Sequence, residues 1–381
     1  MMKSVSLLTV LVLAAASLGL VTSAVEAPAR AQESLQLGIS YVFWRPGYYN
    51  DYEVRSSLAR VAQTGAGWIS LTFNLYQDAI DSHDVYQGYE TPSDEQLAHV
   101  ITHAHDLGLR VMLKPHVNPI YDEGGHWRGL IGSAFDTEQD WERWFSSYRN
   151  MIAHYASLAE AHDVEQFCVG TELRGTTFRE DDWRRLIADV RTRFSGPITY
   201  AANHGGEEMK ITWWDAVDYI GVDAYYALSD HSDPMLEELV EAWEPHVVAL
   251  AGLSSTWEKP ILFTEIGYRS KEGSTQNPWE WVEAGVVDLQ EQADAYQAAF
   301  ESVFDQPWFA GMYWWAWDMV PPKDGPCDNH FTPEGKPAED VLREWYGGPP
   351  RPVSEVTASS CPQPTESPGD RPPRSARTDE E

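Results

Sequence analysis

Short apolar runs alternate with longer helical patterns along the central part of the chain. Eight of these runs have the length and composition of buried strands: residues 37–43, 68–73, 110–117, 165–172, 197–203, 219–225, 260–265 and 310–317. Most of the stretches between them repeat apolar residues every three or four positions, which is typical of amphipathic helices. The fifth connection, near residues 211–218, is short. This alternation within one domain predicts an α/β fold, a single (β/α)₈ TIM barrel.

The helical stretches carry recognisable end signals. Residues 93–108 begin with Ser93 and Asp94, which favour a helix N-terminus, and close at Gly108. Residues 137–162 form a longer stretch in which apolar residues recur at helical spacing. Both segments support helices between the predicted strands.

The two ends of the chain differ in composition from its centre. Residues 1–31 hold one lysine, an apolar stretch and small-residue cleavage patterns ending at Ala24 or Ala31, which predicts a secretory signal peptide. An uncleaved membrane anchor is the alternative, but the stretch is shorter and richer in Ser and Thr than a good span. Residues 347–381 are rich in Pro, Ser and charge, so we expect a disordered tail. The barrel domain is expected over residues 32–346 of an exported protein, extracellular or periplasmic.

The charge balance excludes two classes of partner. Acidic residues outnumber basic ones by 59 to 27, which gives a net charge of -32. Such a surface repels nucleic acid and anionic membranes, so neither is expected as a partner after signal cleavage. A monomer is expected.

The three cysteines follow from the expected export. Cys168 lies in a strand-like run and is interpreted as a small buried apolar residue. Cys327 and Cys361 could pair in an oxidising compartment, but Cys361 lies in the predicted tail, so the sequence leaves this bridge open. No cysteine spacing resembles a metal site, and neither a metal nor another cofactor is expected.

Polar and aromatic residues gather where the predicted strands end. In a (β/α)₈ barrel these C-terminal ends surround the active site. The residues, from the third strand to the eighth, are Lys114, His116, Asn118, Thr171, Glu172, Asn203, His204, Asp223, Tyr225, Glu265, Trp315 and Trp317. We expect them to converge on one mouth.

Two of these residues, Glu172 and Glu265, are acids with the pattern expected for glycoside hydrolysis. One carboxyl group must protonate the leaving oxygen while the other, ionised, attacks the anomeric carbon or activates water. A pair about 5 Å apart would imply a covalent intermediate and retained configuration. The chain also has 17 Trp residues, whose faces can stack on sugars.

Several segments, in their order along the chain, resemble glycoside hydrolase family 113 of clan A. They are "RVMLKPHV", "HWRG", "VGTELRG", "YAAN", "DYIGVDAYY", "LFTEIGYRS", "YWWAWD" and "FTPEGKPAEDVLREWY", within residues 36–346. The resemblance implies that Glu172 is the acid/base, that Glu265 is the nucleophile and that Tyr225 binds it by a hydrogen bond. It also implies endo-β-1,4-mannanase activity on a polysaccharide or oligosaccharide.

The chain departs from the wider clan at one position. Many clan members place Asn before the acid/base to bind the sugar 2-hydroxyl, whereas this chain has Thr171. Asn203 or Asn118 could supply that contact. The departure bears on the choice of substrate more than on the chemistry.

Structural interpretations compete with the functional ones at several positions. The two acids could form ion pairs with Arg174 or Arg269, and Lys114, His116 and Asp223 could serve only as hydrogen-bonding groups of the barrel.

The register of alternate strand residues sorts the aromatic candidates. It favours Tyr225 over Tyr226, places Trp315 and Trp317 on one face, and turns Trp314 towards the helices. Trp44 and Trp127 lie in loops, as sugar platforms or as ordinary loop residues.

Other functions stay open at this stage. The same mechanism could act on a β-glucan, a galactan or a shorter oligosaccharide, or the barrel could bind glycans without catalysis. A metal hydrolase is the weakest alternative, because His103 and His105 fall near the C-terminal end of a predicted helix, away from the expected site.

Overall fold

The computed structural model describes residues 35–44, 47, 50–121, 125–281, 285–319, 327–351 and 361. The predicted signal peptide lies outside these residues, as does most of the predicted tail. Within the described ranges no helix is apolar over a length sufficient to cross a membrane.

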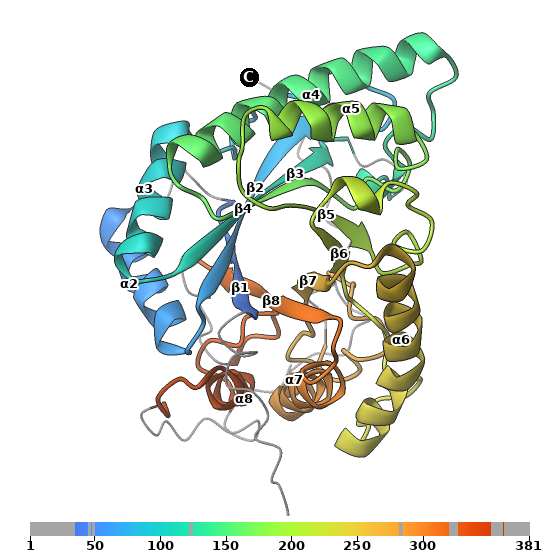
Figure 1. The fold of residues 1–381 in the computed structure, drawn as a ribbon. Coiled ribbons are helices and arrows are strands. Elements are labelled where there is room, and N and C mark those ends of the chain that lie inside the picture. Colours follow the sequence, from blue (N-terminus) through green and yellow to red (C-terminus); the bar gives the residue numbers. More distant parts are fainter. Residues whose placement is uncertain are drawn as a thin grey trace, which may run out of the picture. The chain divides into compact units, whose positions relative to one another are not determined.

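Eight parallel strands close into a barrel, each paired with its neighbours in sequence and β8 paired with β1. They are β1 (Gln36–Val42), β2 (Trp68–Gln77), β3 (Arg110–Pro119), β4 (Gln166–Thr171), β5 (Ile198–Asn203), β6 (Tyr219–Asp223), β7 (Ile261–Ile266) and β8 (Phe309–Asp318). Figure 1 looks along the barrel, with the strands at the centre and the helices outside. The predicted (β/α)₈ fold is confirmed.

The helices follow the strands in the predicted alternation. They are α2 (Asp51–Gln63), α3 (Asp94–Asp106), α4 (Glu138–Ala161), α5 (Glu180–Arg191), α6 (Leu236–Trp257), α7 (Leu289–Val303) and α8 (Pro337–Tyr346), with short 3₁₀ turns η2 (Arg128–Leu130) and η3 (Trp214–Ala216). Ser93 caps α3 and Thr137 caps α4, each within a reciprocal capping box that satisfies free backbone N–H groups. Only η3 separates β5 from β6, as the short fifth connection predicts.

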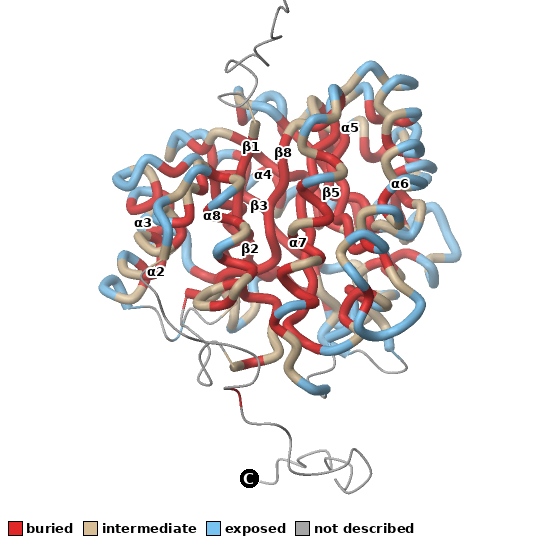
Figure 2. The backbone as a smooth tube through the Cα atoms, turned by 90° about the horizontal axis from the view of Figure 1, so that it is seen from below, coloured by how far each residue is buried: buried red, intermediate tan, exposed pale blue. Residues whose placement is uncertain are grey.

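The core has two layers, one inside the barrel and one between the strands and the helices. The inner layer draws side chains from six strands: Trp68, Met112, Cys168, Ala201, Leu262 and Tyr313. Cys168 is buried with a free thiol, as expected. Figure 2 shows the buried residues along the strands and the exposed ones on the outer sides of the helices. Because both faces of the strands are covered, their sequences read as nearly continuous apolar runs.

An irregularity in β8 changes which tryptophans face the barrel interior. Trp314 pairs with Ile39 and Trp317 with Tyr41, so three steps along β8 match two steps along β1. As a result Trp314 and Trp317 both pack in the outer layer, whereas Trp315 packs on the inside. The prediction for Trp314 is confirmed, and the prediction that Trp315 and Trp317 share a face is wrong, because the extra residue breaks the strand alternation.

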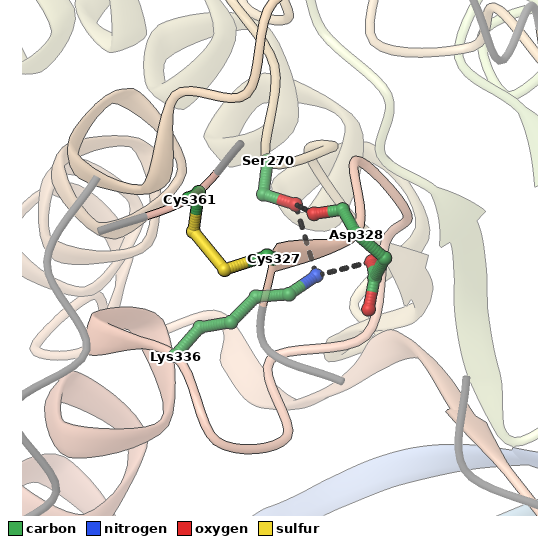
Figure 3. Close-up of a disulfide and its surroundings, with 5 residues drawn as sticks. All are labelled: Ser270, Cys327, Asp328, Lys336 and Cys361. Carbon is green, nitrogen blue, oxygen red and sulfur yellow. Dashed lines mark hydrogen bonds and ion pairs between the residues drawn. A yellow bond between two sulfur atoms is a disulfide. The ribbon is translucent and has the colours of Figure 1, made fainter. Parts of the chain in front are cut away.

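A disulfide joins Cys327, which follows β8, to Cys361 (Figure 3), and their Cα atoms are 5.2 Å apart. Beside it the buried Nζ of Lys336 donates to Oδ1 of Asp328 at 2.7 Å and to Oγ of Ser270 at 2.9 Å. The bridge left open by the sequence is therefore present, and it attaches Cys361 to a segment that is itself bonded to the loop after β7.

Candidate active site

A cavity of about 720 Å³ contains both predicted acids among its lining residues. Nine residues predicted from the sequence line it: Trp44, Asn118, Trp127, Glu172, Asn203, His204, Tyr225, Glu265 and Trp315. The other predicted residues do not line it: Lys114, His116, Thr171, Asp223 and Trp317. The lining residues that belong to β3 to β8, or to the loops after these strands, lie near or beyond the C-terminal strand ends, the usual place for catalysis in this fold.

Glu265, near the end of β7, is held by three side chains. Its Oε2 accepts a hydrogen bond of 2.7 Å from the hydroxyl of Tyr225, and its Oε1 accepts one from Nζ of Lys114. Nε2 of His116 lies 3.3 Å from the same oxygen. Burial alone raises the pKa of Glu265, but the charge of Lys114 and the contact with His116 outweigh it and hold the pKa well below its usual range. Glu265 is therefore ionised at neutral pH.

Lys114 lies beneath Glu265 and is shared with a second acid. Its fully buried ammonium group is 3.2 Å from Oδ1 of Asp223, which also accepts a hydrogen bond of 2.7 Å from Thr264. Burial and the charge of Glu265 raise the pKa of Asp223 well above its usual range. One buried cation thus faces two acids, and it favours the ionised form of Glu265. Burial lowers the pKa of the neighbouring His116 to about 3, so its imidazole is neutral.

Glu172 follows the last residue of β4 and adopts the opposite ionisation preference. Its Oε1 accepts a hydrogen bond of 2.8 Å from Nδ2 of Asn203, and its Oε2 lies 3.2 Å from Nη1 of Arg128. Burial and the charge of Glu265 raise the pKa of Glu172, although Arg128 opposes them. Its backbone has a φ of 53°, which is uncommon for a residue other than glycine and is found at functional sites.

The two cavity acids therefore have pKa values moved apart by their surroundings, one upwards and one downwards. Such a split is the arrangement required of a general acid beside an ionised carboxylate. The model of Glycoside Hydrolase Family 113 matches residues 39–336 of the chain.

The chain belongs to glycoside hydrolase family 113. It is therefore a glycoside hydrolase, with an oligosaccharide or polysaccharide as substrate.

Solved structures agree with the family 113 assignment. A GH113 β-1,4-mannanase in a complex is 32% identical to this chain, with a TM-score of 0.75, over 83% of this chain and 100% of that one. The GH113 β-mannanase AaManA from Alicyclobacillus acidocaldarius in complex with ManMIm is 34% identical, with a TM-score of 0.73, over 83% and 99%. A β-glucuronidase from Ruminococcus gnavus, 14% identical with a TM-score of 0.57 over 82% and 49%, shares the fold alone. No curated protein matches this chain.

Arg128 is the residue of this family 113 site that the sequence reasoning missed beside Glu172. Its guanidinium also donates to Oδ1 of Asn118 through Nε at 3.0 Å and Nη2 at 2.8 Å. The "HWRG" segment contains it, so the signal was present without an assigned role. Arg174, which the sequence analysis considered as an ion-pair partner of the acids, instead lies over the ring of Trp127, 5.4 Å from its centroid.

The walls of the family 113 cavity are aromatic. The ring centroids of Trp44 lie 5.4 Å from Trp315 and 5.9 Å from Trp281, and Trp279 stacks on His204 at 5.0 Å. Trp279 and Trp281 are 43% and 58% exposed, which is unusual for tryptophan. Sequence reasoning missed both because they lie in the loop between β7 and α7, where no periodic pattern marks an exposed face.

The predicted helix histidines lie elsewhere in this family 113 fold. On α3, Nε2 of His103 is 2.6 Å from Oδ1 of Asp51, and Nε2 of His105 is 3.3 Å from Oε2 of Glu165. None of these four residues lines the cavity. Across the described part of the chain no group of three His, Cys, Asp or Glu residues has the geometry to hold a metal ion.

Proposed function

We propose that this family 113 enzyme is a secreted retaining endo-β-1,4-mannanase, with Glu172 as acid/base and Glu265 as nucleophile. The observation that carries the proposal is that two acids line one cavity among different partners, Glu265 beside the ammonium group of Lys114 and Glu172 beside Asn203 and Arg128, and that their pKa values are moved in opposite directions. The named activity of the two relatives that are 32% and 34% identical supports mannan as the substrate.

In the first step, ionised Glu265 attacks the anomeric carbon while protonated Glu172 gives its proton to the departing glycosidic oxygen. The C–O bond to the leaving sugar breaks as an ester bond to Glu265 forms. In the second step Glu172, now ionised, removes a proton from water, which attacks the same carbon and frees Glu265. Two inversions at one carbon retain its configuration.

The surrounding side chains have separate tasks in this mechanism. Tyr225 and Lys114 hold one orientation of the Glu265 carboxylate, so its free lone pairs face the substrate. The tryptophans of the cavity wall offer apolar faces for the sugar rings. Asn203 lines the cavity beside Glu172. We assign it the contact with the mannose 2-hydroxyl that many clan members make through an Asn at the position of Thr171.

Export of a monomer completes the proposal. The N-terminal composition supports a cleaved signal peptide, and the Cys327–Cys361 bridge suits an oxidising compartment. When the protein is expressed with its native leader, N-terminal sequencing of the secreted form should show that it begins after Ala24 or Ala31. Light scattering should give the mass of a monomer. A retained leader or a protein confined to the cytoplasm would contradict export.

Reducing-end release from mannan, glucomannan, xylan and β-glucan by the mature protein tests the activity. We expect cleavage of mannan and glucomannan, with products that carry the retained anomer by NMR. Glu265→Ala should lose activity, whereas Glu244→Ala, at an exposed acid on α6, should keep it. Azide should partly restore Glu172→Ala on a substrate with a good leaving group. That leaving group departs without a general acid, and azide, already an anion, attacks the glycosyl-enzyme without a general base, which yields a glycosyl azide and frees Glu265.

Two other outcomes would change the proposal. Cleavage of only another β-glycan would keep the mechanism and replace the substrate. A folded wild type that cleaves none of the four at low or high salt would favour a glycan-binding barrel, which retention on a mannan affinity gel would then identify.

A further inference from the structure

The carboxyl group of Glu207 lies behind the active site and has no role in the chemistry described above. It follows β5 in the loop before η3, is 1% exposed and does not line the cavity. Its Oε2 accepts a hydrogen bond of 2.7 Å from the backbone N–H of Asn203, and its Oε1 accepts one of 2.5 Å from the hydroxyl of Tyr200. A buried acid that receives two donors from β5 fixes the end of that strand.

Both contacts of Glu207 lead to Glu172. On one side, Asn203 is the residue whose side chain donates to Oε1 of Glu172. On the other side, the hydroxyl of Tyr200 accepts a hydrogen bond of 2.8 Å from the backbone N–H of Leu173, the residue after Glu172. Two short routes, one through a side chain and one through the backbone, therefore join Glu207 to the acid/base.

The surroundings leave these groups little freedom to compensate for a loss. Tyr200 is fully buried, with its ring centroid 5.1 Å from that of Trp183 and 5.2 Å from that of Trp213. Its hydroxyl cannot reach water, and the N–H of Asn203 would be left buried without Glu207. Unsatisfied buried donors are costly, so the strand end would move to find other partners.

We propose that Glu207 is a positioning residue for Glu172, which holds the acid/base in place through Asn203 and through Tyr200. The proposal rests on the role proposed above for Glu172. It deepens that role, because the direction in which the carboxyl group of Glu172 points is then decided by a residue that never touches the substrate.

The protonation state of Glu207 decides which substitution preserves its hydrogen bonds and which one removes them. Burial raises its pKa to about 8, so the group is largely neutral at pH 7. The amide oxygen of glutamine can accept from the N–H of Asn203, as Oε2 of Glu207 does, and its amide nitrogen can donate to the hydroxyl oxygen of Tyr200, which keeps the two side chains in contact but reverses the direction of that hydrogen bond. Glu207→Gln should therefore retain the contacts, whereas Glu207→Leu, of similar size, should remove both.

The test compares kcat/KM, which reports the glycosylation step, on two mannooligosaccharide substrates of equal length. One has an unactivated sugar leaving group that requires protonation, and the other has a dinitrophenyl group that does not. Glu207→Leu should lower kcat/KM about 100-fold on the first, as expected for a misplaced general acid, and less than about 5-fold on the second. Glu207→Gln should recover most of the loss on the first substrate.

Glu208 provides a matched control in the same loop. It is 5% exposed and burial raises its pKa to about 7, but among the described contacts it makes no hydrogen bond to Asn203 or Tyr200. Glu208→Leu should therefore leave the ratio between the two substrates unchanged. The proposal would be overturned if Glu207→Leu lowered kcat/KM equally on both substrates. It would also be overturned if Glu208→Leu changed the ratio of the two kcat/KM values as much as Glu207→Leu does.

Two further measurements keep the test decisive. If Glu207→Leu does not fold, Tyr200→Phe breaks the backbone route alone, and it should still lower kcat/KM selectively on the unactivated substrate. If the wild type cleaves neither substrate, the proposed function fails, but a crystal structure of Glu207→Leu still tests the positioning. Separation of Asn203 Nδ2 from Glu172 Oε1 beyond hydrogen-bond distance would support it, and an unchanged contact of 2.8 Å would overturn it.

Discussion

Replacement of Lys114 by methionine should expose the electrostatic basis of the active site. Lys114 is fully buried, and its ammonium group contacts both Asp223 and Glu265. Methionine keeps the length of the side chain but removes the charge that opposes burial of the two acids. The pKa of Glu265 should rise in the variant, because burial and its acidic neighbour would then act without compensation.

The cost to stability follows from the burial of this ion pair. Loss of one partner of a buried pair costs about 3–5 kcal/mol. In a domain of this size, each kcal/mol lost from the free energy of unfolding lowers the unfolding temperature by about 2 °C. The unfolding temperature of Lys114→Met at neutral pH should therefore be roughly 6–10 °C below that of the wild type. The folded-state pKa of Glu265 is depressed, so its contribution to stability is present above the ordinary Glu pKa of about 4.3 and is lost as the pH falls further. The difference between wild type and variant should therefore shrink in acid.

The assay is the pH dependence of kcat/KM on mannan oligosaccharides together with thermal unfolding at several pH values. The acidic limb, which reports ionisation of Glu265, should move to higher pH in Lys114→Met. Lys336→Met is the matched control, because Lys336 is equally buried and pairs with Asp328 outside the pair of cavity acids. It should lose stability without a shift of the acidic limb. An unshifted limb in Lys114→Met, at reduced stability, would refute the reasoning.

Two further predictions concern contacts of single residues. Tyr225→Phe removes the 2.7 Å hydrogen bond to Glu265, a charge-assisted contact of about 1.5–3 kcal/mol, so the unfolding temperature should fall by roughly 3–6 °C. Because the same contact orients the attacking carboxylate, kcat/KM should fall about 10- to 100-fold, and an unchanged rate would show that this hydroxyl does not assist the nucleophile. The Cys327–Cys361 bridge spans 34 residues and should contribute about 3–4 kcal/mol, so a reductant should lower the unfolding temperature by several degrees. The double variant Cys327→Ser/Cys361→Ser should unfold at that lower temperature with or without reductant, and a continued response to reductant would contradict this assignment.

Much of the fold was predictable because its signals are local. Each strand is a short apolar run, and the caps at Ser93 and Thr137 depend only on residues three positions away. Strand ends were accordingly placed within a few residues, and the two acids followed because barrel topology brings those ends to one mouth. The prediction that Trp317 shares a face with Trp315 assumed regular alternation along β8, and it was wrong because the extra residue in β8 is visible only in its pairing with β1.

The partners of the acids could not be predicted in the same way. The sequence determined that Glu172 and Glu265 end strands of one barrel, because hydrophobic periodicity and strand order are written along the chain. Only the tertiary structure decided that Lys114 and Asp223 meet beneath Glu265, and that Arg128 faces Glu172. Those contacts join segments 44 to 151 residues apart and depend on side-chain direction and burial. The pKa of a buried carboxyl group follows from its neighbours in space, and no local pattern specifies them.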